Sequence, residues 1–385
     1  MQAFKNPGRS KLPNVGTTIF TTVGILAKQH GAIDLSQGFP NFEADPRLFE
    51  LVTKAMHEGY NQYAPMQGDY SLRETIANKM ERLHGTVYHP ETEITVTVGA
   101  TQAIFTAIAA FISPGDEVII LKPAYDCYEP AIELNGGIPV PIQMGLNDYA
   151  IDWEALKNAI TPKTKMLVLN TPHNPSGRVF SKNELQKLET ILEPTDIIVV
   201  SDEVYEHIVF DENEHISLSQ IKGLANRSFI CASFGKTFHV TGWKMGYCAA
   251  PSELMKEFRK VHQFAVFCVD HPTQKAMNTY LQDESLYLGL KSFYQKKRDF
   301  FLNALNSSRF TYSPCEGTYF QLLNYSRITD ENDEAFARRL IIEFGIACIP
   351  ISSFNLNRRH DGVLRFCFAK KNETLEKAAE ILCGL

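Results

Sequence analysis

The amino-acid sequence predicts an α/β fold: a large domain with a mostly parallel sheet covered by helices on both faces, and a smaller α+β domain. Between about residues 90 and 250, short apolar runs rich in β-branched residues alternate with helical patterns. Strands this apolar are typical of parallel sheets that are buried on both faces. A strongly helical region over 251–307 follows, and the tail then alternates strand and helix patterns.

The length and composition fit a folded enzyme-sized protein. The 385 residues suffice for one large domain plus a smaller one, and a hydrophobic content of 44% excludes bulk disorder. A net charge of −6 with interspersed signs argues against a nucleic-acid binder that relies on a basic face. The polar segment 1–11 lacks the apolar core of a signal peptide, and no apolar run is long enough to span a membrane.

The cysteines and histidines indicate a reduced protein that needs no metal. Eight cysteines carry no C-x-x-C pair and stand mostly in apolar stretches, and the eleven histidines form no metal-binding pattern. The sequence therefore predicts a cytoplasmic location and no metal site.

The elements follow one another in a regular order. The predicted strands of the large domain are apolar runs at residues 94–98, 117–121, 165–170, 197–201 and 229–233. The predicted helices between them lie at residues 101–111, 152–160 and 181–192. The last of these helices opens with a capping box, in which Ser181 is followed by Glu184.

The tail is expected to form the smaller domain. Its predicted strands lie at 317–323, 347–351 and 363–369, and its predicted helices at 333–344 and 373–382. The first 45 residues show no sheet pattern of their own and are expected to pack on this tail. We therefore expect a large domain over 46–275 and a small domain made of 1–45 plus 276–385.

Unusual residues follow four predicted strands of the large domain. These groups occupy residues 99–101, 174–177, 202–205 and 233–236. In open α/β sheets, ligands bind beyond the carboxyl ends of the strands. We therefore expect these four groups to converge on one binding site.

Lys236 and Asp202 are the candidates for chemistry in that site. A surface lysine is the alternative interpretation of Lys236 alone, but an amine that is partly desolvated can form a Schiff base with a carbonyl. Asp202 follows an apolar strand, where it is either a helix N-cap or a partner that keeps a heteroaromatic ring nitrogen protonated. Tyr205 and Asn174 come from neighbouring turns, and Asn174 can donate to a phenolate oxygen.

The turn after the first predicted strand indicates an anion site. Gly99, Ala100 and Thr101 lead directly from the strand into a helix, whose first backbone N–H groups attract a phosphate. Ser233 and Lys244 are expected to close this site, although Lys244 taken alone is better explained as a solvated loop charge.

Together these motifs resemble class I aminotransferases of pyridoxal-phosphate fold type I. The ordered motifs are Asn-Pro-Ser-Gly at 174–177, Asp-Glu-Val-Tyr at 202–205, Ser-Phe-Gly-Lys-Thr at 233–237 and Thr-Gly-Trp-Lys-Met-Gly at 241–246. The similarity runs from 36–40 to 364–369, and residues 61–65 and 126–130 resemble the branch of bacterial methionine aminotransferases and kynurenine/glutamine transaminases. This resemblance implies a seven-stranded, mostly parallel sheet and pyridoxal 5'-phosphate as the cofactor.

The resemblance also implies a role for each site residue. Lys236 would bind the cofactor covalently and shuttle a proton, and Asp202 would pair with the ring nitrogen. The remaining cofactor contacts would come from Asn174 and Tyr205 at the ring's 3-oxygen, Tyr125 on the ring face, and Ala100, Thr101, Ser233 and Lys244 at the phosphate. Many relatives carry arginine in place of Lys244, so cofactor affinity is expected to differ.

For the substrates, the resemblance implies that Arg365 binds the α-carboxylate, helped by Asn174 and the backbone of Gly38. It also implies a homodimer in which Tyr63 reaches the phosphate of the second subunit and Phe267 enters the neighbouring pocket. The side-chain pocket is expected to be apolar or aromatic, lined by Ile19, Phe39, Tyr63, Tyr125 and Phe267.

The predicted reaction is transamination between an amino acid and a 2-oxo acid by a ping-pong mechanism. Methionine is the favoured donor, with phenylalanine, tyrosine, glutamine and kynurenine as further candidates, because no second arginine is evident for a distal carboxylate. A carbon–sulfur β-lyase acting on cysteine conjugates stays open as the alternative, since both reactions pass through the same carbanion. A ligand-sensing regulator would need an attached DNA-binding segment, and no helix-turn-helix pattern is present.

Overall fold

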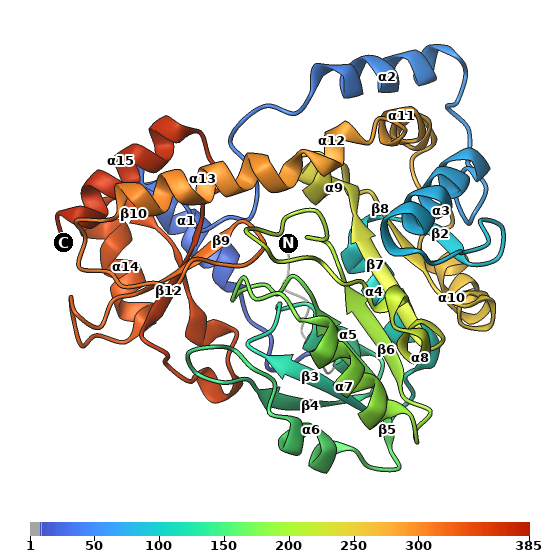
Figure 1. Cartoon of the computed structure of the whole chain (residues 1–385), viewed down its shortest axis with the longest axis horizontal. Coiled ribbons are helices and arrows are strands. Elements are labelled where there is room, and N and C mark those ends of the chain that lie inside the picture. The colour runs from blue at the N-terminus through green and yellow to red at the C-terminus, as the bar shows by residue number, and fades with distance from the viewer. Residues whose placement is uncertain (1–7, 9) are drawn as a thin grey trace.

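A seven-stranded sheet forms the centre of the computed structural model, which describes residue 8 and residues 10–385 (Figure 1). In spatial order its strands are β2 (Ile94–Thr97), β8 (Gly246–Ala249), β7 (Ser228–Ser233), β6 (Ile198–Asp202), β5 (Thr164–Asn170), β3 (Glu117–Lys122) and β4 (Ile138–Gln143). Only β8 runs antiparallel to its neighbours. The prediction of a mostly parallel α/β sheet is therefore confirmed.

Both faces of this sheet are buried, as the apolar strands predict. Along β3, Val118 and Ile120 pack into one hydrophobic cluster while Ile119 and Leu121 pack into another. Successive side chains of a strand point to opposite faces, so the two clusters lie on the two sides of the sheet. Helices α4 (Gly99–Phe111) and α10 (Ser252–Ala265) contribute to the first cluster, and α3 (Tyr70–His84) and α7 (Lys182–Leu192) to the second.

Two strands of this sheet were not identified individually from the sequence. The edge strand β4 carries Pro139 and Pro141, which interrupt a strand pattern and are tolerated at a sheet edge. The antiparallel strand β8 has the sequence Gly-Tyr-Cys-Ala, which contains no β-branched residue and so lacks the usual strand composition. The predicted strands agree with the structure to within one residue at each end.

The other helices connect these strands or extend beyond them. They are α2 (Pro46–His57), α5 (Tyr128–Leu134), α6 (Trp153–Ala159), α8 (Lys222–Ala225), α9 (Phe234–Thr237), α11 (His271–Leu281), α12 (Ser285–Leu288) and α13 (Leu290–Ala304). The capping box expected at Ser181 is present at the start of α7, where the Ser181 hydroxyl and the Glu184 carboxylate cap each other's backbone N–H.

The C-terminal part builds a second, three-stranded antiparallel sheet. Its order is β11 (Ile349–Pro350), β12 (Val363–Cys367) and β9 (Phe320–Asn324), with helices α14 (Asp333–Phe344) and α15 (Asn372–Cys383) beside it. The predicted tail strands are therefore present but shorter than expected.

The N-terminal part joins these C-terminal elements. Helix α1 (Ile19–His30) packs on α14, and a two-residue strand, β1 (Ile33–Asp34), pairs in parallel with β10 (Ile346–Ala347). The described part of residues 1–45 therefore packs on the tail as expected, and β1 is too short to leave a sheet pattern in the sequence. The division into 46–275 and 1–45 plus 276–385 stays a prediction.

Several general features of the described residues bear on the sequence predictions. All eight cysteines are free. Within residues 10–385 no helix has the length and apolar character that crossing a bilayer requires. The described part of the chain also contains no group of three or more side chains that could bind a metal ion. Most of segment 1–11, from which a signal peptide was excluded, lies outside the described residues.

Candidate active site

One cavity, of about 360 Å³, collects nearly all of the predicted site residues. Those that line it are Gly38, Ala100, Thr101, Tyr125, Asn174, Asp202, Tyr205, Ser233, Lys236, Lys244 and Arg365. They come from the ends of β6 and β7, from the start of α4, from β12 and from the segment after β1. The expected convergence of strand ends is therefore present, while the roles assigned to these residues stay predictions.

Lys236 stands in the four-residue helix α9, directly after β7. Its Nζ donates a hydrogen bond to the carbonyl of Gly38 at 3.0 Å, and lies 5.7 Å from the ring centre of Tyr319. Burial lowers the pKa of Lys236 to about 8, because the charged amine has lost most of its water. A lysine with this pKa is partly uncharged near neutral pH, which is the state that attacks a carbonyl.

Asp202 ends β6, and its buried carboxylate has no cationic partner in residues 10–385. Its Oδ2 accepts a short hydrogen bond of 2.6 Å from the Tyr128 hydroxyl, and its Oδ1 has only a 3.4 Å contact with the Val204 N–H. Burial raises the pKa of Asp202 to about 6. A buried carboxylate without a counter-ion is costly, so this side chain suits a cationic ring nitrogen in the cavity.

The start of α4 has the geometry that the predicted anion site requires. No side chain caps the first turn, which leaves its backbone N–H groups available. A Cβ atom at Gly246 would lie 3.2 Å from the Ala100 nitrogen and 2.4 Å from the Ala232 carbonyl, so only glycine allows β8 to approach the helix start this closely. The ammonium of Lys244 lies beside Gly99 at the same point. These groups fit a phosphate.

Arg365 projects from β12 and is 1% exposed. Its Nη1 donates to Asn174 Oδ1 at 2.8 Å and its Nη2 to the Ser36 carbonyl at 3.0 Å, whereas its Nε has no partner in the part of the chain described. The guanidinium forms no ion pair with any described carboxylate and lies 3.9 Å over the ring of Phe320. A buried cation with an unused donor fits the carboxylate of a ligand.

Of the residues expected to line the side-chain pocket, Phe39 and Tyr125 line the cavity of their own chain, whereas Ile19, Tyr63 and Phe267 do not. Phe20 lines the cavity, while Ile19, the first residue of α1, lines a separate groove beside Asp126. A change of one position on a helix turns the side chain by about 100°, and no helix start was predicted in this segment from which to set the direction of its side chains. Phe39, Tyr125 and Phe320 complete the apolar lining.

Tyr63 and Phe267 lie outside the cavity of their own chain. Tyr63 is 79% exposed, Phe267 is 48% exposed, and their rings meet at right angles with centres 5.1 Å apart. Phe264, three positions before Phe267 in the chain, is 86% exposed. The sequence assigned both residues to contacts with a second subunit, and this exposed aromatic group is compatible with that assignment.

Two aromatic residues around the cavity were not singled out from the sequence. Tyr128 bonds to Asp202, and Tyr319 donates to the Gly38 carbonyl, the same oxygen that accepts from Lys236. Tyr128 lies three residues after Tyr125 and belongs to the motif 126–130, so this motif could have pointed to it. Tyr319 has no local signal, because its contact depends on β9 packing against residue 38.

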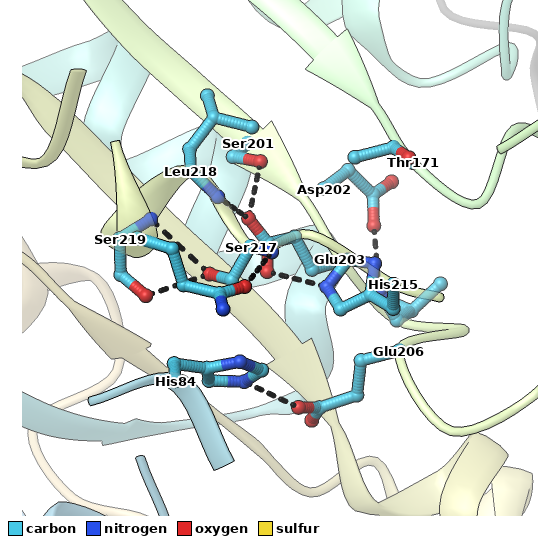
Figure 2. Close-up of polar contacts among 12 residues, drawn as sticks. His84, Thr171, Ser201, Asp202, Glu203, Glu206, His215, Ser217, Leu218 and Ser219 are labelled. Atoms are coloured by element: carbon cyan, nitrogen blue, oxygen red, sulfur yellow. Dashed lines mark hydrogen bonds and ion pairs between the residues drawn. The ribbon is translucent and has the colours of Figure 1, made fainter. Parts of the chain in front are cut away.

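A buried polar network fixes the end of β6 on which Asp202 stands (Figure 2). The carboxylate of Glu203 accepts hydrogen bonds from the Ser201 hydroxyl at 2.7 Å, His215 Nε2 at 2.9 Å and the Leu218 N–H at 3.0 Å. These bonds join the strand end to residues 215–218. Glu203 therefore holds the backbone beside Asp202 without lining the cavity.

A second buried carboxylate, Glu206, lies next to this network. It pairs with Lys79 at 2.7 Å, and His207 Nε2 lies 3.6 Å from the same oxygen. His84 Nε2 lies 3.5 Å from the other oxygen (Figure 2). Burial lowers the pKa of His207 to about 3, whereas the cations beside Glu206 hold the pKa of that carboxyl well below its usual range. The fold therefore requires a neutral His207 beside an ionised Glu206.

Acidification is therefore expected to destabilise the protein through His207. The pKa of His207 is 6.5 in the unfolded chain and about 3 in the folded protein. At pH values between these two, His207 is protonated in the unfolded chain but neutral in the folded protein. The stability is fully present above pH 6.5, and about 1.4 kcal/mol per pH unit is lost below it. Urea unfolding at pH 7, 6 and 5 measures this slope. His207→Gln should reduce this slope by the contribution of one proton, whereas the same change at the exposed His57 should leave the slope unchanged. Equal slopes in the wild type and His207→Gln would contradict the assignment.

Comparison with known proteins agrees with this geometry. The sequence profile of the family "Aminotransferase class I and II" matches residues 30–382. Methionine aminotransferase of Escherichia coli K12 is 46% identical over 97% of both chains, and kynurenine–oxoglutarate transaminase 1 of Rattus norvegicus is 33% identical over 97% of this chain and 96% of that protein. The crystal structure of a methionine aminotransferase from Escherichia coli superposes with a TM-score of 0.96 at 46% identity, over 98% of this chain and 99% of that one.

These matches confirm the resemblance stated from the motifs, including its methionine and kynurenine branch. Family members use pyridoxal phosphate and take amino acids and oxo acids as substrates. The cavity that gathers Lys236, Asp202 and Arg365 therefore stands in an enzyme scaffold of known type: the chain belongs to the class I and II aminotransferases.

Proposed function

We propose that this aminotransferase binds pyridoxal 5'-phosphate and transfers the α-amino group of an apolar, sulfur-containing or aromatic amino acid, with methionine favoured, to a 2-oxo acid. The observation that carries the proposal is a single cavity that holds a partly uncharged lysine amine and a buried aspartate without a counter-ion. Each group lacks a partner that this cofactor would provide.

The residues present fit the cofactor at each of its polar groups. Lys236 Nζ would hold it covalently, Asp202 would face the ring nitrogen, and Asn174 and Tyr205 would bind the 3-oxygen. Tyr125 would cover the ring face. The phosphate would bind at the start of α4, with contacts from Ala100, Thr101, Ser233 and Lys244.

Arg365, Gly38 and Lys236 would each perform a separate part of the reaction. When bound, pyridoxal phosphate supplies an electron sink for the electron pair left at the substrate's α-carbon. Arg365 Nε and the Gly38 backbone would orient the substrate carboxylate, so that the α-hydrogen faces Lys236. Once the incoming amino group has displaced Lys236 from the cofactor, the freed Nζ would take that proton and give it back later in the transfer. Because the amino group stays on the enzyme between the two substrates, ping-pong kinetics are expected.

The apolar lining supports the choice of amino donor. Phe20, Phe39, Tyr125 and Phe320 line the same cavity as Arg365, which is the only arginine that lines it in the described part of the chain. A distal carboxylate would find no second arginine there, whereas a thioether gains about 0.3–1.5 kcal/mol from contact with an aromatic ring. The relatives named for methionine and kynurenine point the same way.

A screen of half-reactions tests the donor directly. The holoenzyme is mixed with one amino acid at a time, and the absorbance of the bound cofactor is followed without any oxo acid. Methionine and the aromatic amino acids should change the spectrum faster than aspartate does. A response to aspartate alone would contradict the proposal, and release of pyruvate and ammonia from cysteine conjugates would favour the β-lyase instead.

The conservative change Arg365→Lys is expected to lower kcat/KM for methionine by about 10- to 100-fold, mainly through KM. Lysine keeps the charge but loses the planar fork, and a hydrogen bond to a charged group contributes about 1.5–3 kcal/mol. Steady-state kinetics measure this, with Arg338→Lys at an exposed position of α14 as the control. An unchanged KM would remove Arg365 from the substrate site.

We also propose a cytoplasmic homodimer in which Tyr63 binds the phosphate of the partner's cofactor. The exposed pair of aromatic rings of Tyr63 and Phe267 supports this, because large exposed aromatic side chains mark contact surfaces. Sedimentation should give twice the monomer mass. Tyr63→Phe should weaken cofactor binding without changing the mass, whereas a monomeric enzyme with full activity would contradict the proposal.

A further inference from the structure

We propose that Tyr128 is a positioning residue for catalysis: its hydroxyl fixes the Asp202 carboxylate so that the other oxygen, Oδ1, is presented to the ring nitrogen of the cofactor. The inference rests on the proposed function, since it assigns a residue that acts on the cofactor only through Asp202. Tyr128 does not line the cavity, so it makes no contact of its own with a bound ligand there.

The position of Tyr128 is determined by packing around it. It is the first residue of α5 and is 2% exposed, within the cluster formed by α4, α5 and one face of the sheet. Its ring meets that of Tyr125 at 77° with centres 6.0 Å apart. Tyr125, three residues earlier in the chain, lines the cavity, whereas Tyr128 contacts the cavity residue Asp202 without lining the cavity itself.

The hydrogen bonds of Asp202 are distributed unequally between its two oxygens. Oδ2 accepts from the Tyr128 hydroxyl at 2.6 Å, whereas Oδ1 has only the 3.4 Å contact with the Val204 N–H. A tyrosine hydroxyl donates one hydrogen, and a carboxylate oxygen accepts it best when it is ionised. Tyr128 therefore leaves Oδ1 as the oxygen that is free to accept from a protonated nitrogen.

The charge state of Asp202 depends on the same bond. Burial raises the pKa of Asp202 to about 6, and the hydrogen bond from Tyr128 is the largest influence that lowers it. Burial raises the pKa of Tyr128 well above its ordinary value, so this hydroxyl stays a donor. The other titratable groups that act on or respond to Asp202 are Lys236, Glu203, Tyr125, Cys127, Tyr205 and Cys231.

Without the hydrogen bond from Tyr128, a larger fraction of Asp202 should be protonated and neutral. Lys236 also lowers the pKa of Asp202, but its influence is smaller than that of the hydroxyl. Removing the bond should therefore move the pKa of Asp202 upward by about one unit, the size of one hydrogen bond to a charged group. A neutral carboxyl cannot keep the ring nitrogen protonated, and the electron sink would weaken.

The experiment compares Tyr128→Phe with Tyr149→Phe, each reconstituted with ¹⁵N-labelled pyridoxal phosphate. Tyr149 is also a buried tyrosine, but its hydroxyl has no hydrogen-bond partner in the described part of the chain, and it does not line the cavity. In Tyr128→Phe, the ¹⁵N signal of the ring at pH 7.5 should move toward that of an unprotonated pyridine. The acid limb of kcat/KM should rise by about one pH unit, and kcat should fall about tenfold with little change in KM. Tyr149→Phe should show none of these changes.

A double-mutant cycle with Asp202→Asn separates positioning from a general structural role. If Tyr128 acts through Asp202, Tyr128→Phe should have little further effect on kcat in the Asp202→Asn background. The inference is overturned if the wild-type ring nitrogen is protonated and Tyr128→Phe leaves the ¹⁵N signal and the acid limb unchanged. A wild-type protein that binds no pyridoxal phosphate would instead remove the proposed function.

Discussion

Lys236→Ala is expected to lower transamination by at least about 10³-fold while the protein stays folded. Lys236 is proposed both to hold the cofactor and to move the α-proton, and loss of a general acid–base group alone costs about 10²–10⁴-fold. Alanine leaves no amine within reach, because the nearest other lysine of the cavity, Lys244, is proposed to bind the phosphate. Single-turnover kinetics with methionine measure the loss.

The matched control for this change is Lys256→Ala, which removes an exposed lysine from α10. It should retain wild-type turnover. Circular dichroism should be the same for both variants, since Lys236 makes one hydrogen bond, to the Gly38 carbonyl. Turnover of Lys236→Ala within tenfold of the wild type would show that another group carries the proton.

The second large effect is expected for Asp202→Asn, with kcat lower by about 10²–10³-fold. Asparagine keeps the shape and still accepts the hydrogen bond from Tyr128, but it carries no charge to hold a proton on the ring nitrogen. Removal of one electrostatic contact to a developing charge in a buried site typically has this size. Steady-state kinetics at pH 7.5 and the spectrum of the bound cofactor measure it.

Asp283→Asn, a change at an exposed aspartate, serves as the control for charge loss alone. KM for methionine should change little in Asp202→Asn, because Arg365 and not Asp202 is proposed to bind the carboxylate. A kcat close to that of the wild type would mean that the ring nitrogen needs no charged partner in this enzyme, and the role assigned to Asp202 would be lost.

The sheet could be predicted where the chain leaves a strong local pattern. The five long apolar runs are strands, because strands buried on both faces must be apolar throughout. Strand β4 contains two prolines, β8 has no β-branched residue, and β1 has only two residues, so their pairing depends on neighbours that are distant in sequence. No local period marks such strands.

Site residues, like the strands, could be predicted only where a local sequence pattern marks them. Asn174, Asp202 and Lys236 each follow a strand, so the topology brings them together once the sheet is known. Phe20 was missed because its direction depends on where α1 begins, and Tyr319 because its partner, Gly38, lies 281 positions away in the chain. The charge states of Lys236 and Asp202 depend on burial, which only the packed structure determines.

The pairing of β1 with β10 has a consequence for the newly made chain. Ile33 emerges from the ribosome early, but its partner Ile346 is synthesised near the end. At roughly 5–20 residues per second, this interval lasts about 15–60 s. During that time the N-terminal segment must remain unpaired, so it is the part of the nascent polypeptide on which a holding chaperone would have the longest opportunity to act.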